Sequence, residues 1–100
     1  MSFQKDIFAA VAAIPMGKVS TYGKVAASAG YPGAARAAGN ALHTNTNPET
    51  VPCHRVVHAD GSLGGNYAFG GPEAQRKRLI TEGVRFFGDR VDMATCLYED

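Results

Sequence analysis

The chain has 100 residues, of which 45% are hydrophobic, and it carries a formal net charge of +1. This length allows one domain with a modest core, so we expect residues 1–100 to form a single domain. No apolar run approaches the roughly 20 residues of a membrane span, and no secretory pattern follows Met1. These observations exclude the membrane-spanning class, and we expect a cytoplasmic protein with no membrane partner.

The charges are divided unevenly along the chain. Up to His58 there are five basic and two acidic residues, a balance of +3, whereas from Ala59 onward five basic residues meet seven acidic ones, a balance of −2. A basic surface attracts polyanions such as nucleic acids. The first half is therefore the better candidate for a polyanion-binding face, and a solvated surface of mixed charge is the alternative.

The first segment predicts an amphipathic helix. Ser2 can cap its start, and Pro15 forces the chain out of it. Its apolar residues keep to one helical face: Phe3, Ile7, Phe8, Val11 and Ile14. We expect this helix to pack into the core, to which the rest of the chain contributes Val25, Leu42, Val56, Leu79, Ile80, Phe86 and Phe87.

Two further helices are predicted in the first half. Ser20 or Thr21 can cap a short helix that Gly30 would end. After a connector at 31–33, the alanine-rich segment 34–42 predicts the next helix. Two short helices joined by a small glycine-containing turn are typical of a helix-turn-helix unit. The small alanine side chains allow close approach to a groove or to another helix.

The second half predicts short β elements and one more helix. Segment 51–58 resembles a short strand that starts after Pro52. Pro72 suits the first position of a helix, and Gly83 suits its C-terminal stop. In this helix Arg76, Lys77 and Arg78 crowd one turn and are expected to be solvated. Segment 84–91, with Gly88-Asp89 at its centre, predicts a hairpin.

Cys53 and His54 place a candidate nucleophile directly beside a candidate base. The thiolate is the reactive form of cysteine, and a neighbouring imidazole can help to form it. In an extended segment, however, successive side chains point to opposite faces, so the two residues need a bend or a bridging water. A buried hydrophobic role for Cys53 is the alternative. In a reducing compartment, Cys53 and Cys96 are expected as free thiols.

Several separated elements together resemble the DNA-binding domain of O6-alkylguanine-DNA alkyltransferases. They match in order and spacing from about Phe3 to Gly83, and they are Thr21-Tyr22-Gly23, Ala35-Arg36-Ala37, Asn45, the Pro52 to Val56 segment and Glu82-Gly83. The resemblance implies an α+β, mostly helical fold, a single winged helix-turn-helix-like domain with short β elements.

The short chain and its tail from Gly83 resemble the alkyltransferase-like proteins, a branch of this family that recognises alkylated guanine without repairing it. Members of that branch usually have tryptophan where this chain has Cys53. The resemblance also implies that the separate N-terminal domain of the larger family members is absent. The sequence thus combines the acceptor of a transferase with a body similar to its non-enzymatic relatives.

The resemblance implies a DNA-binding face and a base-flipping step. Family members bind the minor groove and rotate the damaged nucleotide into a pocket, because an atom inside the base stack is not open to attack. Arg36, with Ala35 beside it, would fill the vacated space, and a surface cation on phosphate is its alternative role. Tyr22 would donate toward the departing guanine, and a half-buried core aromatic is its alternative role.

The resemblance also implies a reaction centre. Cys53 would accept the alkyl group as a stable thioether, so each molecule would act once. His54 would be the base, working through a water, and Glu82 would orient it and stabilise the imidazolium. Asn45 would support the active-site segment, and Asn47 is the alternative for this place.

The same resemblance implies an alkyl pocket. Tyr67 would form its aromatic wall on the glycine-rich loop, and Val51 and Pro52 would line it. The position after the tyrosine is commonly a serine in transferases, whereas this chain has Ala68. We therefore expect an enlarged, more apolar pocket that admits bulkier alkyl groups.

Two functions follow from these elements. The first is a DNA repair protein that binds duplex DNA, flips out O6-alkylguanine and transfers the alkyl group irreversibly to Cys53. The second is a damage-recognition protein that binds the lesion and recruits other repair proteins. The acceptor chemistry needs no cofactor. We expect no metal, because His43, Cys53, His54, His58 and Cys96 lack two close ligand pairs, and we expect a monomer.

Overall fold

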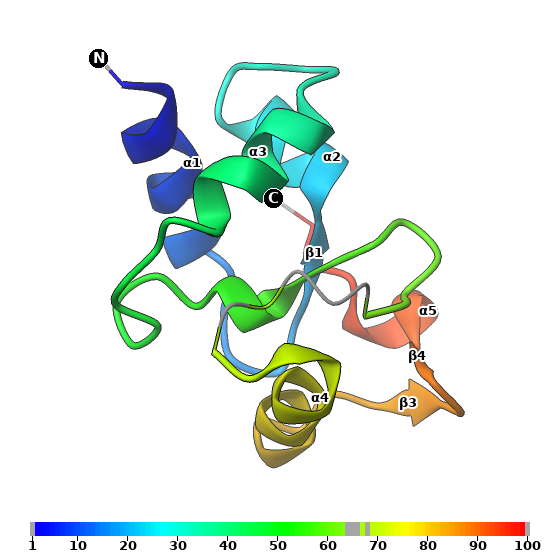
Figure 1. Cartoon of the computed structure of the whole chain (residues 1–100). Coiled ribbons are helices and arrows are strands. Elements are labelled where there is room, and N and C mark those ends of the chain that lie inside the picture. Colours follow the sequence, from blue (N-terminus) through cyan, green and yellow to red (C-terminus); the bar gives the residue numbers. More distant parts are fainter. Residues whose placement is uncertain (1, 64–66, 68, 100) are drawn as a thin grey trace.

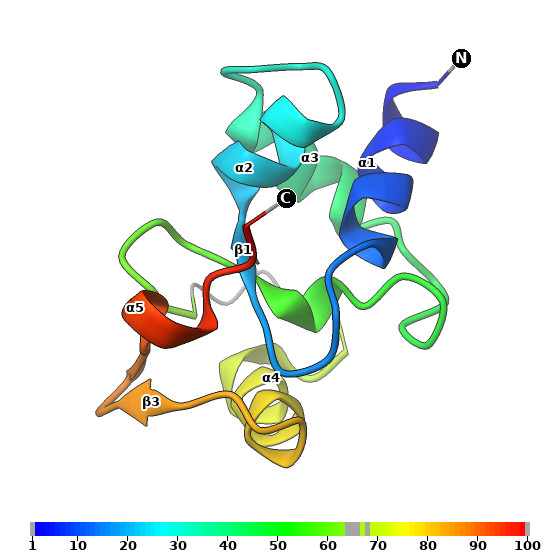
Figure 2. The same ribbon diagram turned by 180° about the vertical axis from the view of Figure 1, so that it is seen from behind.

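The computed structural model describes residues 2–63, 67 and 69–99. In chain order its elements are α1 (Phe3–Ala12), β1 (Ser20–Thr21), α2 (Tyr22–Ser28), α3 (Ala35–Leu42), the 3-10 turn η1 (Cys53–Arg55), β2 (Val56–Val57), α4 (Gly71–Thr81), β3 (Phe86–Phe87), β4 (Arg90–Val91) and α5 (Met93–Cys96). Helices α1, α2 and α3 gather at one end, α4 and the β3–β4 hairpin lie at the other, and η1 lies between them (Figures 1 and 2). The predicted mostly helical α+β fold is confirmed.

Helix α1 begins at the predicted cap. The side chain of Ser2 accepts a hydrogen bond from the backbone N–H of Lys5, which satisfies one of the unpaired donors of the first turn. Ile7 and Val11 are fully buried on its inner face. Phe3 packs edge-on against Tyr31 with ring centres 4.7 Å apart, so the outer turn of α1 is attached to the connector that follows α2.

Helices α2 and α3 form the predicted helix-turn-helix pair. Thr21 caps α2 by accepting a hydrogen bond from the backbone N–H of Lys24 at 3.1 Å. Gly30, with φ of +96°, ends it, because glycine adopts this left-handed conformation without steric cost. Ala26 of α2 and Ala38 of α3 are completely buried, and side chains of this size let the two helices pack closely.

A short parallel strand pair connects this helical end to the centre of the molecule. Ser20 pairs with Val56 and Thr21 with Val57, so the start of α2 lies beside the segment that directly follows η1. Val19 also forms a parallel bridge with Leu97. The C-terminal segment therefore runs along β1, as both views of the ribbon show.

The strand predicted over 51–58 is wrong for its first part. Residues Cys53–Arg55 form a 3-10 turn, and only Val56–Val57 are extended. The reason lies in Pro52, which has φ of −76° and ψ of 70°. These angles form an inverse γ-turn that tightens the chain ahead of the strand.

Helix α4 and the following hairpin lie close to their predicted bounds. The helix begins at Gly71, one residue before Pro72, after Gly70 with φ of +124°. It ends before Gly83, which has φ of +93°. Phe86 pairs with Val91 and Phe87 with Arg90 in the predicted antiparallel hairpin.

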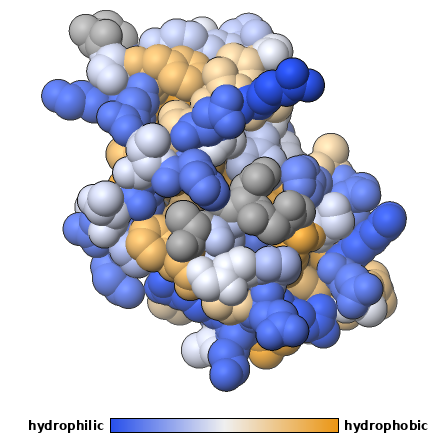
Figure 3. All heavy atoms as spheres, viewed as in Figure 1, coloured by the Kyte–Doolittle hydropathy of each residue, from blue (hydrophilic) through white to orange (hydrophobic). Residues whose placement is uncertain are grey.

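Two residues predicted for the core lie at the surface. Ile80 is 51% exposed and Phe87 is 74% exposed. Leu79 takes the inward position on α4, and the next residue lies about 100° around the helix from it. On the face seen in Figure 3, apolar residues lie among a predominantly hydrophilic surface. No helix among the described residues is long and apolar enough to span a membrane.

Candidate active site

Cys53 lies at the start of η1, held by the γ-turn that precedes it. Its backbone N–H donates to the carbonyl oxygen of Val51 at 2.7 Å. The same oxygen accepts a hydrogen bond from Nδ2 of Asn45 at 2.9 Å. The Cys53 side chain is only 8% exposed. The Val51 carbonyl oxygen therefore accepts two hydrogen bonds, which hold the Cys53 backbone and the Asn45 side chain beside each other.

Asn45 reaches the thiol itself. Its Nδ2 lies 3.6 Å from Sγ of Cys53, and its Oδ1 accepts the backbone N–H of Asn47 at 3.0 Å. The side chain of Asn47 instead accepts the backbone N–H groups of Glu49 and Thr50 within the loop. Of the two asparagines considered for this place, the structure brings Asn45 to Cys53.

His54 faces the end of α4. Successive side chains of a 3-10 turn are about 120° apart around its axis, so His54 points away from Cys53. Its Nε2 lies 2.9 Å from Oε2 of Glu82. Arg55 donates to both oxygens of the same carboxylate, from Nε at 2.9 Å and from Nη2 at 2.8 Å. Glu82 thus connects His54, the candidate base, to the guanidinium of Arg55, which binds the carboxylate through two nitrogens.

The hydrogen bond to Glu82 determines which nitrogen of His54 is available. A carboxylate only accepts, so Nε2 carries the proton and Nδ1 of the neutral ring keeps its lone pair. Nδ1 is buried and has no hydrogen-bond partner among the described residues. His54 therefore presents an unprotonated nitrogen, as a base requires.

Burial sets the protonation states of this group. Burial raises the pKa of the Cys53 thiol, although Asn45, the backbone and the charge of Arg78 act in the opposite direction. Burial also lowers the pKa of His54, against the influence of Glu82. For Glu82 burial acts to raise the pKa, but the hydrogen bonds from Arg55 and His54 outweigh it, and the pKa is lowered. The resting site contains a thiol, a neutral imidazole and a carboxylate.

One face of α4 supports this centre. Gln75, 3% exposed, donates from Nε2 to the carbonyl oxygens of His54 at 3.0 Å and of Val56 at 3.1 Å. Arg78, Leu79 and Glu82 follow at three, four and seven residues further on, the spacing of one helical face. Sequence reasoning identified Glu82 but missed Gln75, Arg55 and Arg78. The spacing on α4 was the signal that could have indicated Gln75 and Arg78, whereas Arg55 lies in η1, outside this helix.

Tyr67, predicted as an aromatic wall of the alkyl pocket, is a buried neighbour of His54. It is 6% exposed, and its ring lies edge-on to that of His54 with centres 6.4 Å apart. Its hydroxyl accepts a hydrogen bond from Nη1 of Arg78 at 3.3 Å. The prediction that Arg78 is simply solvated is therefore wrong. Ala68, on which the expected enlargement of the pocket depends, lies outside the described residues.

The fully solvated turn predicted for α4 is also wrong at Arg76. Its guanidinium carbon lies 4.5 Å from the centre of the Phe86 ring, and Nη1 donates to the carbonyl oxygen of Gly88 at 2.8 Å. Lys77 is exposed, as predicted. The three basic residues therefore have three different environments, because adjacent positions on a helix face in different directions.

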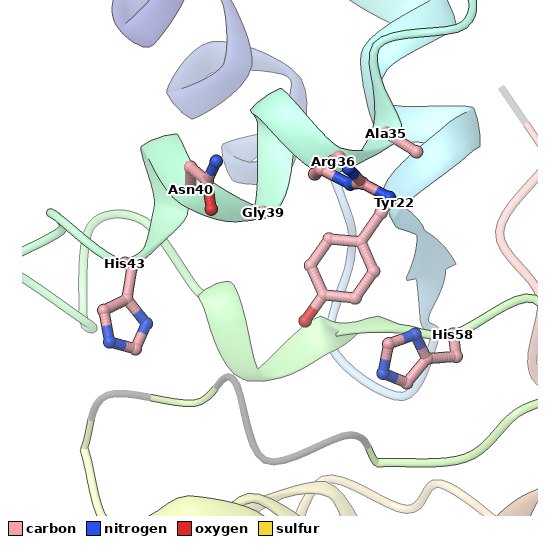
Figure 4. A pocket seen from close by; sticks show the side chains of 7 residues that line it. All are labelled: Tyr22, Ala35, Arg36, Gly39, Asn40, His43 and His58. Carbon is pink, nitrogen blue, oxygen red and sulfur yellow. The ribbon is translucent and has the colours of Figure 1, made fainter.

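Tyr22 and Arg36 line a second feature, an open hollow of about 370 Å³ beside α3. Figure 4 shows the Tyr22 ring between α3 and the η1–β2 segment, with its hydroxyl directed toward that segment. The ring packs beside Gly39, where an added Cβ would be in ordinary van der Waals contact with it at 3.6 Å. His58 lies beside Tyr22 with ring centres 5.4 Å apart. Ala35 completes this part of the lining.

The Cys53 site and the hollow at Tyr22 are connected by the parallel pair of β1 and β2. Tyr22 follows β1 directly, and β1 pairs with β2, which directly follows the Cys53 turn. Both cysteines are buried free thiols. Within the described residues no group of three or more His, Cys, Asp or Glu side chains is placed to hold a metal. The buried sulfur of Cys53 thus lies in the turn before β2, and the Tyr22 hollow lies beside α3.

The family pattern described as "6-O-methylguanine DNA methyltransferase, DNA binding domain" matches residues 2–84. The chain belongs to this family. A methylated-DNA--protein-cysteine methyltransferase of Salmonella typhimurium is 47% identical over 78 residues, which are 78% of this chain and 43% of that protein. The chain thus spans less than half the length of this transferase.

Two solved structures of family members in complex with DNA resemble this chain. S. pombe Atl1, bound to damaged DNA containing O6-carboxymethylguanine, has a TM-score of 0.81 and 34% identity, with 98% of this chain and 95% of Atl1 covered. Mycobacterium tuberculosis OGT bound to DNA has a TM-score of 0.78 and 42% identity, with 83% of this chain and 50% of that one covered. Both branches of the family are therefore represented among the similar proteins.

Proposed function

We propose that the chain binds duplex DNA, flips out O6-alkylguanine and accepts the alkyl group irreversibly on Cys53. The observation that carries this proposal is the position of Cys53. Its sulfur lies beside Asn45, and the next residue, His54, is hydrogen-bonded to Glu82 through Nε2 while Nδ1 has no partner among the described residues. His54 is thus an oriented base next to the thiol in the sequence, and a bridging water between Nδ1 and the sulfur would complete the pair that nucleophilic catalysis requires.

The proposed transfer is a single displacement. Nδ1 of His54 takes the proton of the Cys53 thiol through a bridging water, and Glu82 stabilises the resulting imidazolium. The thiolate then attacks the alkyl carbon, so that a sulfur–carbon bond forms as the bond from that carbon to O6 breaks. The electron pair of the broken bond stays with guanine, and Tyr22 donates toward the base. The proton on His54 returns to solvent, and guanine takes up one proton.

Tyr22, Ala35 and Arg36 are proposed to act on the DNA. Arg36 is exposed on the first turn of α3, where a guanidinium can enter the space that the flipped base leaves. Tyr22 lies between this helix and the Cys53 segment (Figure 4). The extruded base would therefore pass Tyr22 on its way to a pocket formed by Tyr67, Val51 and Pro52.

The test is transfer of a labelled methyl group. Duplex DNA that contains labelled O6-methylguanine is incubated with the wild-type chain, with Cys53→Ser and with Cys96→Ser as the matched control. We expect one label per molecule on the wild type and on Cys96→Ser, and none on Cys53→Ser. Label on Cys53→Ser, or no label on any of the three, would contradict the proposal.

A second function is favoured by two observations. The likeness to Atl1 covers nearly the whole of both chains, and burial raises the pKa of the Cys53 thiol, which disfavours the thiolate. Under this alternative the chain binds O6-alkylguanine tightly, and other repair proteins complete the repair. Tight binding to the alkylated duplex without transfer of label would support it.

A further inference from the structure

Arg76 and Arg78 lie on the same helix but in different environments. Residues two positions apart on a helix lie about 200° apart around its axis. Arg76 covers the ring of Phe86 and donates to Gly88. Arg78 donates to the hydroxyl of Tyr67 at 3.3 Å. Arg76 and Arg78 therefore carry the same charge, but only Arg78 faces the Cys53 site.

The contact with Tyr67 is the more consequential of the two that Arg78 makes. Arg78 also lies 3.5 Å from Glu49, but the Glu49 side chain is 83% exposed, and solvent weakens such an ion pair. Tyr67 is buried, and its ring lies against that of His54. Arg78 thus holds a side chain that contacts the base candidate.

Arg78 has an electrostatic effect on Cys53, because the other charges nearby offset each other. Arg55 and Glu82 form a close pair whose charges offset each other, and the resting His54 is neutral. The charge of Arg78 lowers the pKa of both Cys53 and His54, against the stronger effect of burial on the thiol. A cation placed here favours the thiolate and keeps the base unprotonated.

We propose that Arg78 is a positioning residue of the Cys53 site, which holds the buried Tyr67 ring beside His54 through the tyrosine hydroxyl and promotes the reaction of Cys53. Its benefit to alkyl transfer rests on the proposed function. Its effect on the reactivity of Cys53 does not, and can be measured without DNA.

The experiment measures alkylation of Cys53 by iodoacetamide in a Cys96→Ser background. The thiolate attacks the methylene carbon, a sulfur–carbon bond forms, iodide leaves with the electron pair of the broken bond, and the thiol proton passes to the buffer. Rates are followed from neutral to strongly alkaline pH for Arg78→Met, Arg78→Gln, Arg78→Lys and the matched control Arg76→Met. The polar and charged groups around this site are Asn45 at the thiol, His54 and Arg55 on the Glu82 carboxylate, and Glu49, Tyr67 and Glu82 near Arg78.

We expect Arg78→Met to slow alkylation at neutral pH by about threefold to tenfold, because the thiolate fraction falls. The difference should disappear at alkaline pH, where the thiol is ionised in both proteins. Arg78→Gln, which retains a donor for Tyr67 without the charge, should also react slowly, whereas Arg78→Lys should recover most of the rate. Arg76→Met should stay within about twofold of the parent, since it removes the same charge from the other face.

Equal rates for Arg78→Met and Arg76→Met would overturn the proposal. So would a loss that is the same at every pH, since that would indicate changed access to the sulfur rather than changed ionisation. If Arg78→Met does not fold, the comparison of Arg78→Gln with Arg78→Lys decides the same question. An Arg78-dependent alkylation rate combined with no transfer from labelled DNA would leave this proposal standing and reject the proposed transferase function.

Discussion

In the proposed reaction centre, neither Cys53 nor His54 is charged at rest. Burial favours the neutral thiol and the neutral imidazole. The ionised groups are the neighbouring Glu82 carboxylate and the Arg55 guanidinium that binds it. His54 can therefore accept a proton at neutral pH, and the carboxylate that would stabilise the imidazolium is already in contact with it.

The Glu82 contacts predict an acid-dependent stability. The pKa of Glu82 is lowered in the folded chain from its usual 4.5, so its contribution is present above about pH 4.5 and is lost as the pH falls through the lowered pKa. The pKa of His54 is lowered from its usual 6.5. The unfolded chain therefore binds the His54 proton first, and stability begins to fall below about pH 6.5.

We expect Glu82→Gln to reduce the free energy of unfolding by about 3 kcal/mol at neutral pH, because it leaves the largely buried Arg55 without its anion. The difference from the wild type should shrink below about pH 4.5, where Glu82 itself becomes protonated. Urea unfolding between about pH 7 and pH 3 measures it, with the exposed Glu73→Gln of the same helix as control. A difference that stays constant down to pH 3 would show that charge does not carry the effect.

At the scale of elements, α4 and η1 act together. A 3-10 turn of three residues is too short to hold its own conformation, since it has few internal hydrogen bonds. Helix α4 supplies the missing contacts through Gln75, which joins the carbonyl groups on either side of Arg55, and through Glu82 at its C-terminal end. The reactive segment is thus held by a helix from a distant part of the sequence.

We expect Gln75→Met to destabilise the chain by about 2 kcal/mol, because two buried carbonyl groups lose their donor while the side-chain volume is nearly kept. Transfer to Cys53 should fall several-fold, with little change in DNA binding, because Gln75 lies on α4 and donates to the reactive segment. Urea unfolding, labelled transfer and duplex binding are measured beside the exposed Lys77→Met. Unchanged stability and transfer in Gln75→Met would contradict this role for α4.

At the scale of the whole molecule, the two ends have different roles in the proposed function. The helix-turn-helix end lies in the half of the sequence with a balance of +3, and the α4 end carries much of the support for the reactive segment. The β1–β2 pair joins them, so Tyr22 and Cys53 belong to adjoining elements although 31 positions separate them. A base that leaves the DNA at α3 would have a short path to the thiol.

We expect Arg36→Ala to weaken binding to alkylated duplex while transfer from free O6-alkylguanine changes little. The slope of log binding constant against log salt should also decrease by about 1 if Arg36 contacts phosphate, and by less if it lies in the base stack. Binding at several salt concentrations and transfer from the free base measure both effects. Equal losses with duplex and with free base would show that Arg36 does not act through the DNA.

The sequence by itself determined the elements that depend on local signals. Ser2 and Thr21 act as helix caps, Gly30 and Gly83 end helices, and the hairpin at 86–91 forms where it was predicted. These outcomes depend on neighbouring residues only, through capping hydrogen bonds and backbone conformation. The order and spacing of the motifs also indicated the family, and the resemblance to that family implied that Cys53, His54 and Glu82 form one group.

Only the tertiary structure decided which side chains meet. The turn at Cys53, the choice of Asn45 over Asn47 and the exposure of Ile80 depend on contacts that short-range patterns do not encode. Arg78 was predicted to be solvated and Gln75 was assigned no role, but packing of α4 against η1 brings Gln75 to the reactive segment and places Arg78 at Tyr67. Contacts between distant segments arise from packing, and they give the Cys53 thiol its burial, its neighbours and its protonation state.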